Sequence, residues 1–133
     1  MVDTDHEHML RAVELARGRG ARVSVDLSSW SAIRDSGENA FREAVRAAAP
    51  DVVFANEDEE QVLSGMLPEV TWILKRGSAG VRFDGDERVA APTERVVDTT
   101  GAGDALAAGW IVGGPDLALE AAARCVAQMG AMP

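Results

Sequence analysis

Residues 98–104 read Asp-Thr-Thr-Gly-Ala-Gly-Asp, and the apolar run Ala-Leu-Ala-Ala-Gly-Trp-Ile-Val follows directly at residues 105–112. Two glycines on either side of an alanine let backbone N–H groups turn inward without obstruction by side chains. The apolar run predicts a buried helix that starts at this loop. Free N–H groups and the positive end of a helix dipole attract anions. The stretch therefore predicts a phosphate site with the carboxylate of Asp104 beside it.

A simpler interpretation of the same stretch is a strand-to-helix turn that the glycines close and Asp104 caps. Two other phosphate-binding loops do not fit. The chain contains no G-x-x-x-x-G-K-[ST] segment. The dinucleotide fingerprint G-x-G-x-x-G also fails, because its third glycine would fall at Leu106 and only a short strand at Val96-Val97 precedes the loop.

The composition is that of one globular, acidic domain. The chain has 133 residues, 47% of them hydrophobic, and a net charge of −9 from 13 basic and 22 acidic residues. Such acidity argues against nucleic-acid or anionic-membrane partners, so a phosphate site must be built locally. The N-terminus is polar and no apolar run is long enough to cross a bilayer, which predicts a cytoplasmic protein. The single cysteine, Cys125, excludes an internal disulfide and is expected in the core.

Segments with helical and strand periodicity alternate along the chain. Helices are expected at 9–16, at 41–48, from Asn56, and twice after the glycine loop, the second entered at Pro115-Asp116. Strands are expected at 22–27, 52–55 and 70–74, and in a hairpin that pairs 81–83 with 88–90 through Asp84-Gly85. This order predicts an α/β fold with three layers, α/β/α, around a mostly parallel sheet.

The string from Asp98 to Asp104 resembles the second signature of the PfkB family of ribokinase-like carbohydrate kinases, D-T-x-G-A-G-D. The resemblance covers nearly all of residues 1–133 but only the C-terminal part of the family, since the glycine-rich sugar-binding signature and the lid sheet are not found before Asp26. It implies an incomplete ribokinase-like fold that holds the nucleotide side. It also implies ATP-dependent transfer of the γ-phosphate to a hydroxyl of a sugar or related small molecule, and either self-association or pairing with the missing N-terminal half.

The resemblance assigns roles within the glycine motif. Asp104 matches the family's catalytic base, which takes the proton of the acceptor hydroxyl. Three residues match the anion hole that neutralises charge on the transferred phosphoryl group: Gly101, Ala102 and Gly103. Asp98 and Thr100 match positions that help to hold a K⁺-like ion in several members, although the other ligands of that ion would lie beyond residue 133.

Asn56-Glu57-Asp58-Glu59 resembles the family's N-x-x-E motif. In that motif, Asn56 and Glu59 would organise water-bound Mg²⁺ beside the phosphates. The same spacing is that of an ordinary helix capping box, which alone would explain both residues. The two roles are compatible.

Lys75-Arg76-Gly77-Ser78-Ala79-Gly80 resembles the family's nucleotide-side turn, a strand end followed by G-x-x-G. Lys75 would then meet a nucleotide phosphate, whereas Gly77 and Gly80 could simply form the entry to the following hairpin. Asp26-Leu27-Ser28 resembles the family's D-x-N strand end, with serine in place of asparagine.

The sequence is also compatible with two rival functions. One is a non-catalytic fragment that keeps the nucleotide-side fold and binds nucleotide without transfer, and the isolated chain is expected to be inactive without an acceptor pocket. The other is a flavodoxin-like or phosphoacceptor module that uses Asp26. That module would need an acidic cluster at neighbouring strand ends, which the sequence does not show.

Overall fold

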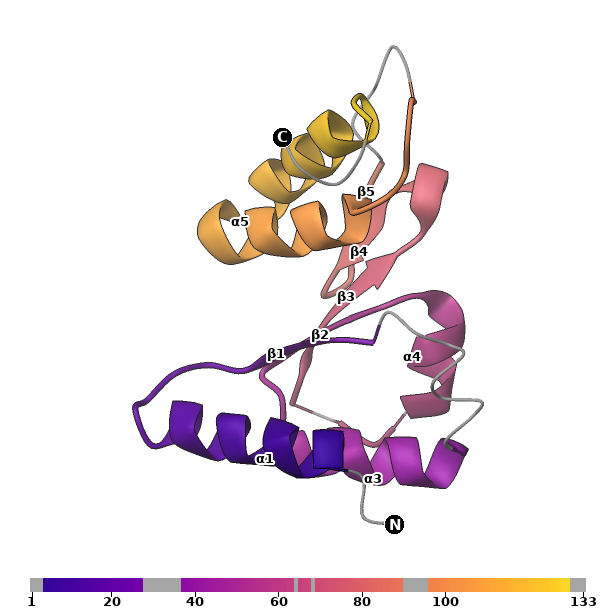
Figure 1. Cartoon of the computed structure of the whole chain (residues 1–133). Coiled ribbons are helices and arrows are strands. Elements are labelled where there is room, and N and C mark those ends of the chain that lie inside the picture. The colour runs from indigo at the N-terminus through magenta and orange to yellow at the C-terminus, as the bar shows by residue number, and fades with distance from the viewer. Residues whose placement is uncertain (1–3, 28–36, 64, 68, 90–95, 130–133) are drawn as a thin grey trace. The chain divides into compact units, whose positions relative to one another are not determined.

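The computed structural model describes residues 4–27, 37–63, 65–67, 69–89 and 96–129 (Figure 1). The elements follow the order α1 (Thr4–Arg17), β1 (Ser24–Asp26), α3 (Glu38–Ala48), β2 (Val52–Ala55), α4 (Glu57–Leu63), β3 (Thr71–Lys75), η1 (Gly77–Ala79), β4 (Val81–Phe83), β5 (Asp86–Arg88) and α5 (Ala102–Val126). The chain divides into two compact units, Met1–Leu74 and Lys75–Pro133.

The sheet of the first unit is parallel. Strand β1 pairs with β2, with Val25 opposite Val53, and β2 pairs with β3, with Phe54 opposite Ile73. All four residues of β2 are buried, as the continuous apolar run predicted for a strand covered on both faces. The strands predicted at 22–27, 52–55 and 70–74 are therefore confirmed. The bounds of β2 agree with the prediction, and the ends of β1 and β3 are shifted by one or two residues.

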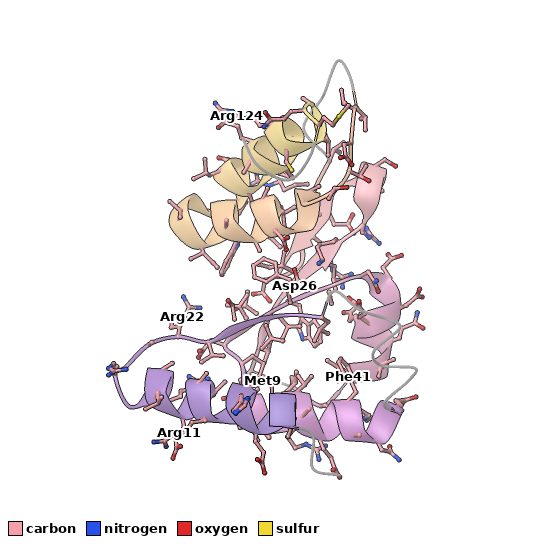
Figure 2. All side chains as sticks on the ribbon, in the orientation of Figure 1. Met9, Arg11, Arg22, Asp26, Phe41 and Arg124 are labelled. Atoms are coloured by element: carbon pink, nitrogen blue, oxygen red, sulfur yellow. The ribbon has the colours of Figure 1, made fainter. Side chains whose placement is uncertain are left out.

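The core of the first unit lies between these strands and the helices. Its buried members are Leu27, directly after β1, and residues of α3, β2, α4 and β3: Val45, Val53, Ala55, Leu63 and Leu74. Phe41 on α3 (labelled in Figure 2) and Trp72 on β3 pack against them. Trp72 thus belongs to the core of this unit.

Helices α1 and α3 end where their sequences indicate. Turn residues 18–20, which include Gly18 and Gly20, follow Arg17, and α3 ends at Ala49, whose φ of 44° is left-handed. The Ala49 N–H donates to the carbonyls of Val45 and Arg46, and Pro50 then prevents another helical turn. At its other end, α3 has Gly37 as its N-cap.

Asp51 ties together the end of α1 and the starts of β1 and β2. Its Oδ2 accepts the Val23 N–H at 2.7 Å and lies 3.0 Å from Nη1 of Arg17. Arg17 also donates to the Ala49 carbonyl. The hydrogen bond from Val23 and the Arg17 guanidinium hold the pKa of Asp51 below its ordinary value, against the opposing effect of partial burial.

This lowered pKa predicts a defined acid sensitivity. A carboxylate whose pKa is lower in the folded state stabilises the fold above its unfolded pKa, and this stabilisation is lost as pH falls through the folded pKa. We expect the urea midpoint of the chain to fall below about pH 4, and to fall less steeply in Asp51→Asn, which starts from a lower midpoint. The control is Glu43→Gln, on the exposed side of α3. Parallel pH profiles for the wild type and Asp51→Asn would contradict the assignment.

In the second unit, β4 and β5 form an antiparallel hairpin. The predicted partner segment 88–90 is wrong, because Phe83 pairs with Asp86 and Val81 with Arg88. The reason lies in the turn. Asp84 and Gly85 have φ of 49° and 93°, and positive φ at both central residues is typical of the two-residue type I′ turn. Such a turn reverses the chain at once and leaves no room for a longer loop.

Helix α5 consists of two helical segments joined at Gly114, whose φ of 76° and ψ of −161° are not helical. Two helices with the second entered at Pro115 are therefore confirmed. The strand expected at Val96-Val97 is wrong. The N–H of Val97 instead donates to the carbonyl of Val126, at the end of α5, at 2.7 Å.

The whole chain has the α/β fold class predicted from its sequence. The β1–β2 and β2–β3 pairs of the first unit are parallel, and the β4–β5 pair of the second unit is antiparallel. Within the described ranges, no helix is long and apolar enough to cross a membrane.

Candidate functional site

The glycine motif forms the start of α5. Gly101 is the N-cap, with a left-handed φ of 77°, a conformation that costs residues with a side chain roughly 1 kcal/mol or more. Its carbonyl accepts the Ala105 N–H at 2.9 Å, the first bond of the helix. Before it, the Thr100 N–H donates to Oδ1 of Asp98 at 2.9 Å. Asp98 thus sets the direction of the chain into the loop.

Not all N–H groups of this loop are engaged. Ala102 donates its N–H to the Thr99 carbonyl at 3.2 Å, so it is occupied within the loop itself. In the described part of the chain, the N–H groups of Gly101, Gly103 and Asp104 have no such acceptor. Two of the three predicted anion-hole residues, Gly101 and Gly103, therefore offer free donors at the positive end of a helix dipole.

Asp104 lies in the first turn of α5 and is exposed. Among the described residues its carboxylate forms no hydrogen bond or ion pair, so it does not cap the helix by the bond that the simpler interpretation required. A carboxylate that satisfies no structural bond, next to free N–H donors, is available for proton transfer.

Lys75 lies against the same loop. A methyl group placed on Gly103 would lie 3.6 Å from Nζ and 3.9 Å from Cδ of Lys75. Lys75 is the last residue of β3 and is half-buried. The strand end therefore places an ammonium group beside a glycine whose N–H is free, and both groups suit a phosphate.

The turn after Lys75 is stabilised by its own backbone. The Arg76 N–H donates to the Gly80 carbonyl at 2.9 Å, and the Gly80 N–H donates to the Gly77 carbonyl at 3.2 Å. Gly77 and Gly80 have φ of 57° and 107°, which favours glycine at both positions. The alternative that these glycines shape the entry to the hairpin is thus sufficient to explain them.

In the first unit, Asn56 and Glu59 form a complete capping box. The Glu59 N–H donates to Oδ1 of Asn56 at 2.8 Å, and the Asn56 N–H donates to Oε2 of Glu59 at 2.9 Å. The Glu59 side chain is buried, at 2% exposure. No cluster of three or more His, Cys, Asp or Glu that could hold a metal occurs in the described segments. The capping bonds engage Oδ1 of Asn56 and Oε2 of Glu59, an arrangement more compatible with an ion that keeps its own waters than with one bound directly.

The predicted monovalent-cation positions serve the loop in this structure. Oδ1 of Asp98 accepts the Thr100 N–H, and the Thr100 carbonyl accepts a hydrogen bond from the Cys125 thiol at 3.3 Å. These two residues alone do not complete the coordination of a K⁺ ion.

Asp26 is the last residue of β1 and is half-buried (Figure 2). Ser28, which would complete the D-x-N resemblance, lies outside the described residues. In the described segments, Asp26 belongs to no group of three or more His, Cys, Asp or Glu that could hold a metal ion.

The sequence did not indicate which residues bind the segment that leads into the glycine loop. Cys125 and Val126 at the end of α5 contact residues 97, 98 and 100 through hydrogen bonds. Only the small size of Cys125 among apolar neighbours was visible in the sequence, and it indicated burial rather than this contact.

The fold and the glycine loop at the start of α5 thus define an α/β protein whose helix start has the chemistry that suits a phosphate. Residues 2–132 match the pfkB family carbohydrate kinases, and the chain belongs to this family.

Solved structures agree with this assignment. A probable sugar kinase from Rhizobium etli CFN 42 is 26% identical with a TM-score of 0.77, and the match covers 94% of this chain and 45% of that one. The adenosine kinase from Sinorhizobium meliloti is 25% identical with a TM-score of 0.77, covering 95% and 46%. An uncharacterized sugar kinase from Pyrococcus horikoshii, solved in complex with ATP, shares the fold at 23% identity, with a TM-score of 0.75 and coverage of 97% and 49%. The chain thus spans less than half the length of these structures.

Proposed function

We propose that the chain is the C-terminal, nucleotide-binding part of a carbohydrate kinase domain that transfers the γ-phosphate of ATP to a hydroxyl of a sugar or related small molecule. The observation that carries the proposal is the arrangement at the start of α5. Among the described residues, the N–H groups of Gly101 and Gly103 have no acceptor and the Asp104 carboxylate has no partner. The ammonium group of Lys75 lies beside Gly103.

Each group has one task in this reaction. The N–H donors of Gly101 and Gly103 stabilise negative charge on the transferred phosphoryl group, and they do so without reorganisation because the loop holds them in place. Lys75 adds a full positive charge beside Gly103 and offsets the repulsion that a −9 chain exerts on a nucleotide. Asp104 accepts the proton of the acceptor hydroxyl as that oxygen attacks phosphorus.

The proposed reaction includes a magnesium ion that protein side chains would contact only through its bound water molecules. Asn56 and Glu59 would orient waters of the ion, which when bound would neutralise charge on the phosphates. Their capping box keeps both side chains in fixed positions with or without the ion.

The first test is ATP binding to the chain itself, measured by calorimetry with and without Mg²⁺. We expect saturable binding, and we expect Lys75→Met to weaken it roughly 10- to 100-fold, the scale of a lost charge-assisted hydrogen bond. The matched control is Arg124→Met, which removes the same charge from an exposed position on α5 where Arg124 pairs with Glu120. Unchanged affinity in Lys75→Met, or equal weakening in both variants, would contradict the role of Lys75.

The rival function, a fragment that binds nucleotide without transfer, is favoured by the coverage of less than half of the solved structures. Incubation of the chain with ATP, Mg²⁺ and a panel of sugars tests whether these residues transfer phosphate without a further acceptor-binding segment. We expect binding without turnover, because an acceptor pocket supplies the positioning that much of the rate requires. Robust turnover would mean that the acceptor pocket is built from the segments in this chain.

A further inference from the structure

The last turn of α5 holds the stretch that leads into the glycine loop. The Val126 carbonyl accepts the N–H groups of both Val97, at 2.7 Å, and Asp98, at 3.2 Å. The Cys125 thiol donates to the Thr100 carbonyl at 3.3 Å. Three of the four residues from 97 to 100 are thus bonded to one helix end, although Thr100 and Cys125 are 25 positions apart in the chain.

Two features indicate that this contact is specific. The last carbonyls of a helix have no partner within the helix, and at Val126 that unused acceptor is satisfied by the stretch before the loop. Cys125 is buried, at 5% exposure, so its thiol has no competition from bulk water.

The kink at Gly114 explains how the two ends of α5 come together. The second segment folds back along the first so closely that a Cβ on Gly109 would lie 2.8 Å from Cα of Ala118. The helix end therefore returns to the side of its own start, where Thr100 and Gly101 lie. No strand pairing holds residues 96–100, so this helix end replaces the ladder that would otherwise fix them.

We propose that Cys125 and the Val126 carbonyl are positioning groups for the phosphate loop, acting through Val97, Asp98 and Thr100. They touch neither nucleotide nor acceptor. They fix the backbone from which Gly101, Gly103 and Asp104 project, and a loop that moves by about 1 Å loses much of its catalytic advantage. The effect on catalysis rests on the proposed function, whereas the effect on the loop does not.

The test compares three substitutions of Cys125 by amide hydrogen exchange in the chain without nucleotide. Cys125→Ser keeps a donor, Cys125→Val keeps the volume and removes the donor, and Cys125→Ala removes both. We expect exchange at Val97, Asp98 and Thr100 to rise roughly 2- to 10-fold in the Val and Ala variants, the scale of one hydrogen bond, and to stay near the wild type in Ser. Val112→Ala, on the exposed side of α5 at 80% exposure, is the control and should change none of these amides.

A second variant tests the carbonyl, which substitution at Val126 would leave in place. Ala123→Gly weakens the last turn of α5, because glycine is the poorer helix former. Exchange at Val97 and Asp98 should rise there as well. If amide exchange in Cys125→Val equals that of the wild type while exchange in Cys125→Ser and Cys125→Ala is faster, Cys125 acts by packing alone and the proposal is wrong. Unchanged exchange in all variants would also overturn it.

In a complete kinase that contains this chain, the same Cys125 variants distinguish an effect on loop position from an effect on folding. The Val and Ala variants should lower kcat by about the factor by which loop exchange rises, with thermal stability close to that of Ser. Loop exchange that responds as expected, together with no turnover by the complete protein that contains this chain, would refute the proposed function and leave the positioning intact. Loop exchange that does not respond refutes the positioning whatever the activity.

Discussion

In a complete kinase that contains this chain, as the proposed function requires, replacing Asp104 by asparagine will lower kcat roughly 100- to 10,000-fold, the usual effect of losing a general base. The affinity for ATP will stay nearly the same, since in the proposed site the phosphate is held by N–H groups and by Lys75 rather than by this carboxylate. Asparagine keeps the size of the side chain and cannot accept the proton. Steady-state kinetics and ATP binding on the same preparation measure both quantities.

The chain offers a matched control for this substitution. Asp116 is an exposed aspartate early in the second segment of α5, where it pairs with Arg88 at 3.0 Å. Asp116→Asn removes the same charge from the same helix, away from the glycine loop, and should leave kcat within about twofold, since exposed ion pairs contribute little. Near-normal turnover in Asp104→Asn, or equal losses in both variants, would show that Asp104 is not the base.

The sequence was sufficient where a local pattern determines the structure. A continuous apolar run placed β2 at Val52–Ala55 without error, because burial on both faces leaves no alternation to misinterpret. The capping spacing of Asn56 and Glu59 predicted the two hydrogen bonds observed there. The glycines placed the start of α5 at Gly101, since few other residues adopt its φ.

The sequence was not sufficient where contacts join distant residues. Two apolar residues at Val96-Val97 suggested a strand, but the N–H of Val97 donates to the Val126 carbonyl at a helix end. No local sequence pattern indicates this contact between distant residues. The proximity of Lys75 and Gly103 likewise joins a strand end to a helix start 28 positions later. The family resemblance assigned Lys75 and Gly103 to one site, but only the structure shows that the two residues are neighbours.

A larger side chain at Gly109 should destabilise the second unit more than any other glycine substitution in α5. A Cβ there would lie 2.6 Å from the Leu117 carbonyl oxygen and 2.8 Å from Cα of Ala118. Both atoms belong to the backbone and cannot rotate away, so the two segments of α5 must separate. We expect Gly109→Val to lower the free energy of unfolding by about 3 kcal/mol, the upper range for overpacking, as measured by urea unfolding followed by circular dichroism.

The same substitution four residues later gives the control. A Cβ on Gly113 would meet the Leu117 side chain, with Cδ2 at 2.7 Å, and this side chain is 37% exposed and can swing toward water. Gly113→Val should therefore cost less than about 1 kcal/mol. Because separation of the segments also moves Cys125 away from Thr100, Gly109→Val should speed amide exchange at residues 97–100, whereas Gly113→Val should not. Equal losses of stability in the two variants would mean that the close approach at Gly109 does not hold α5 together.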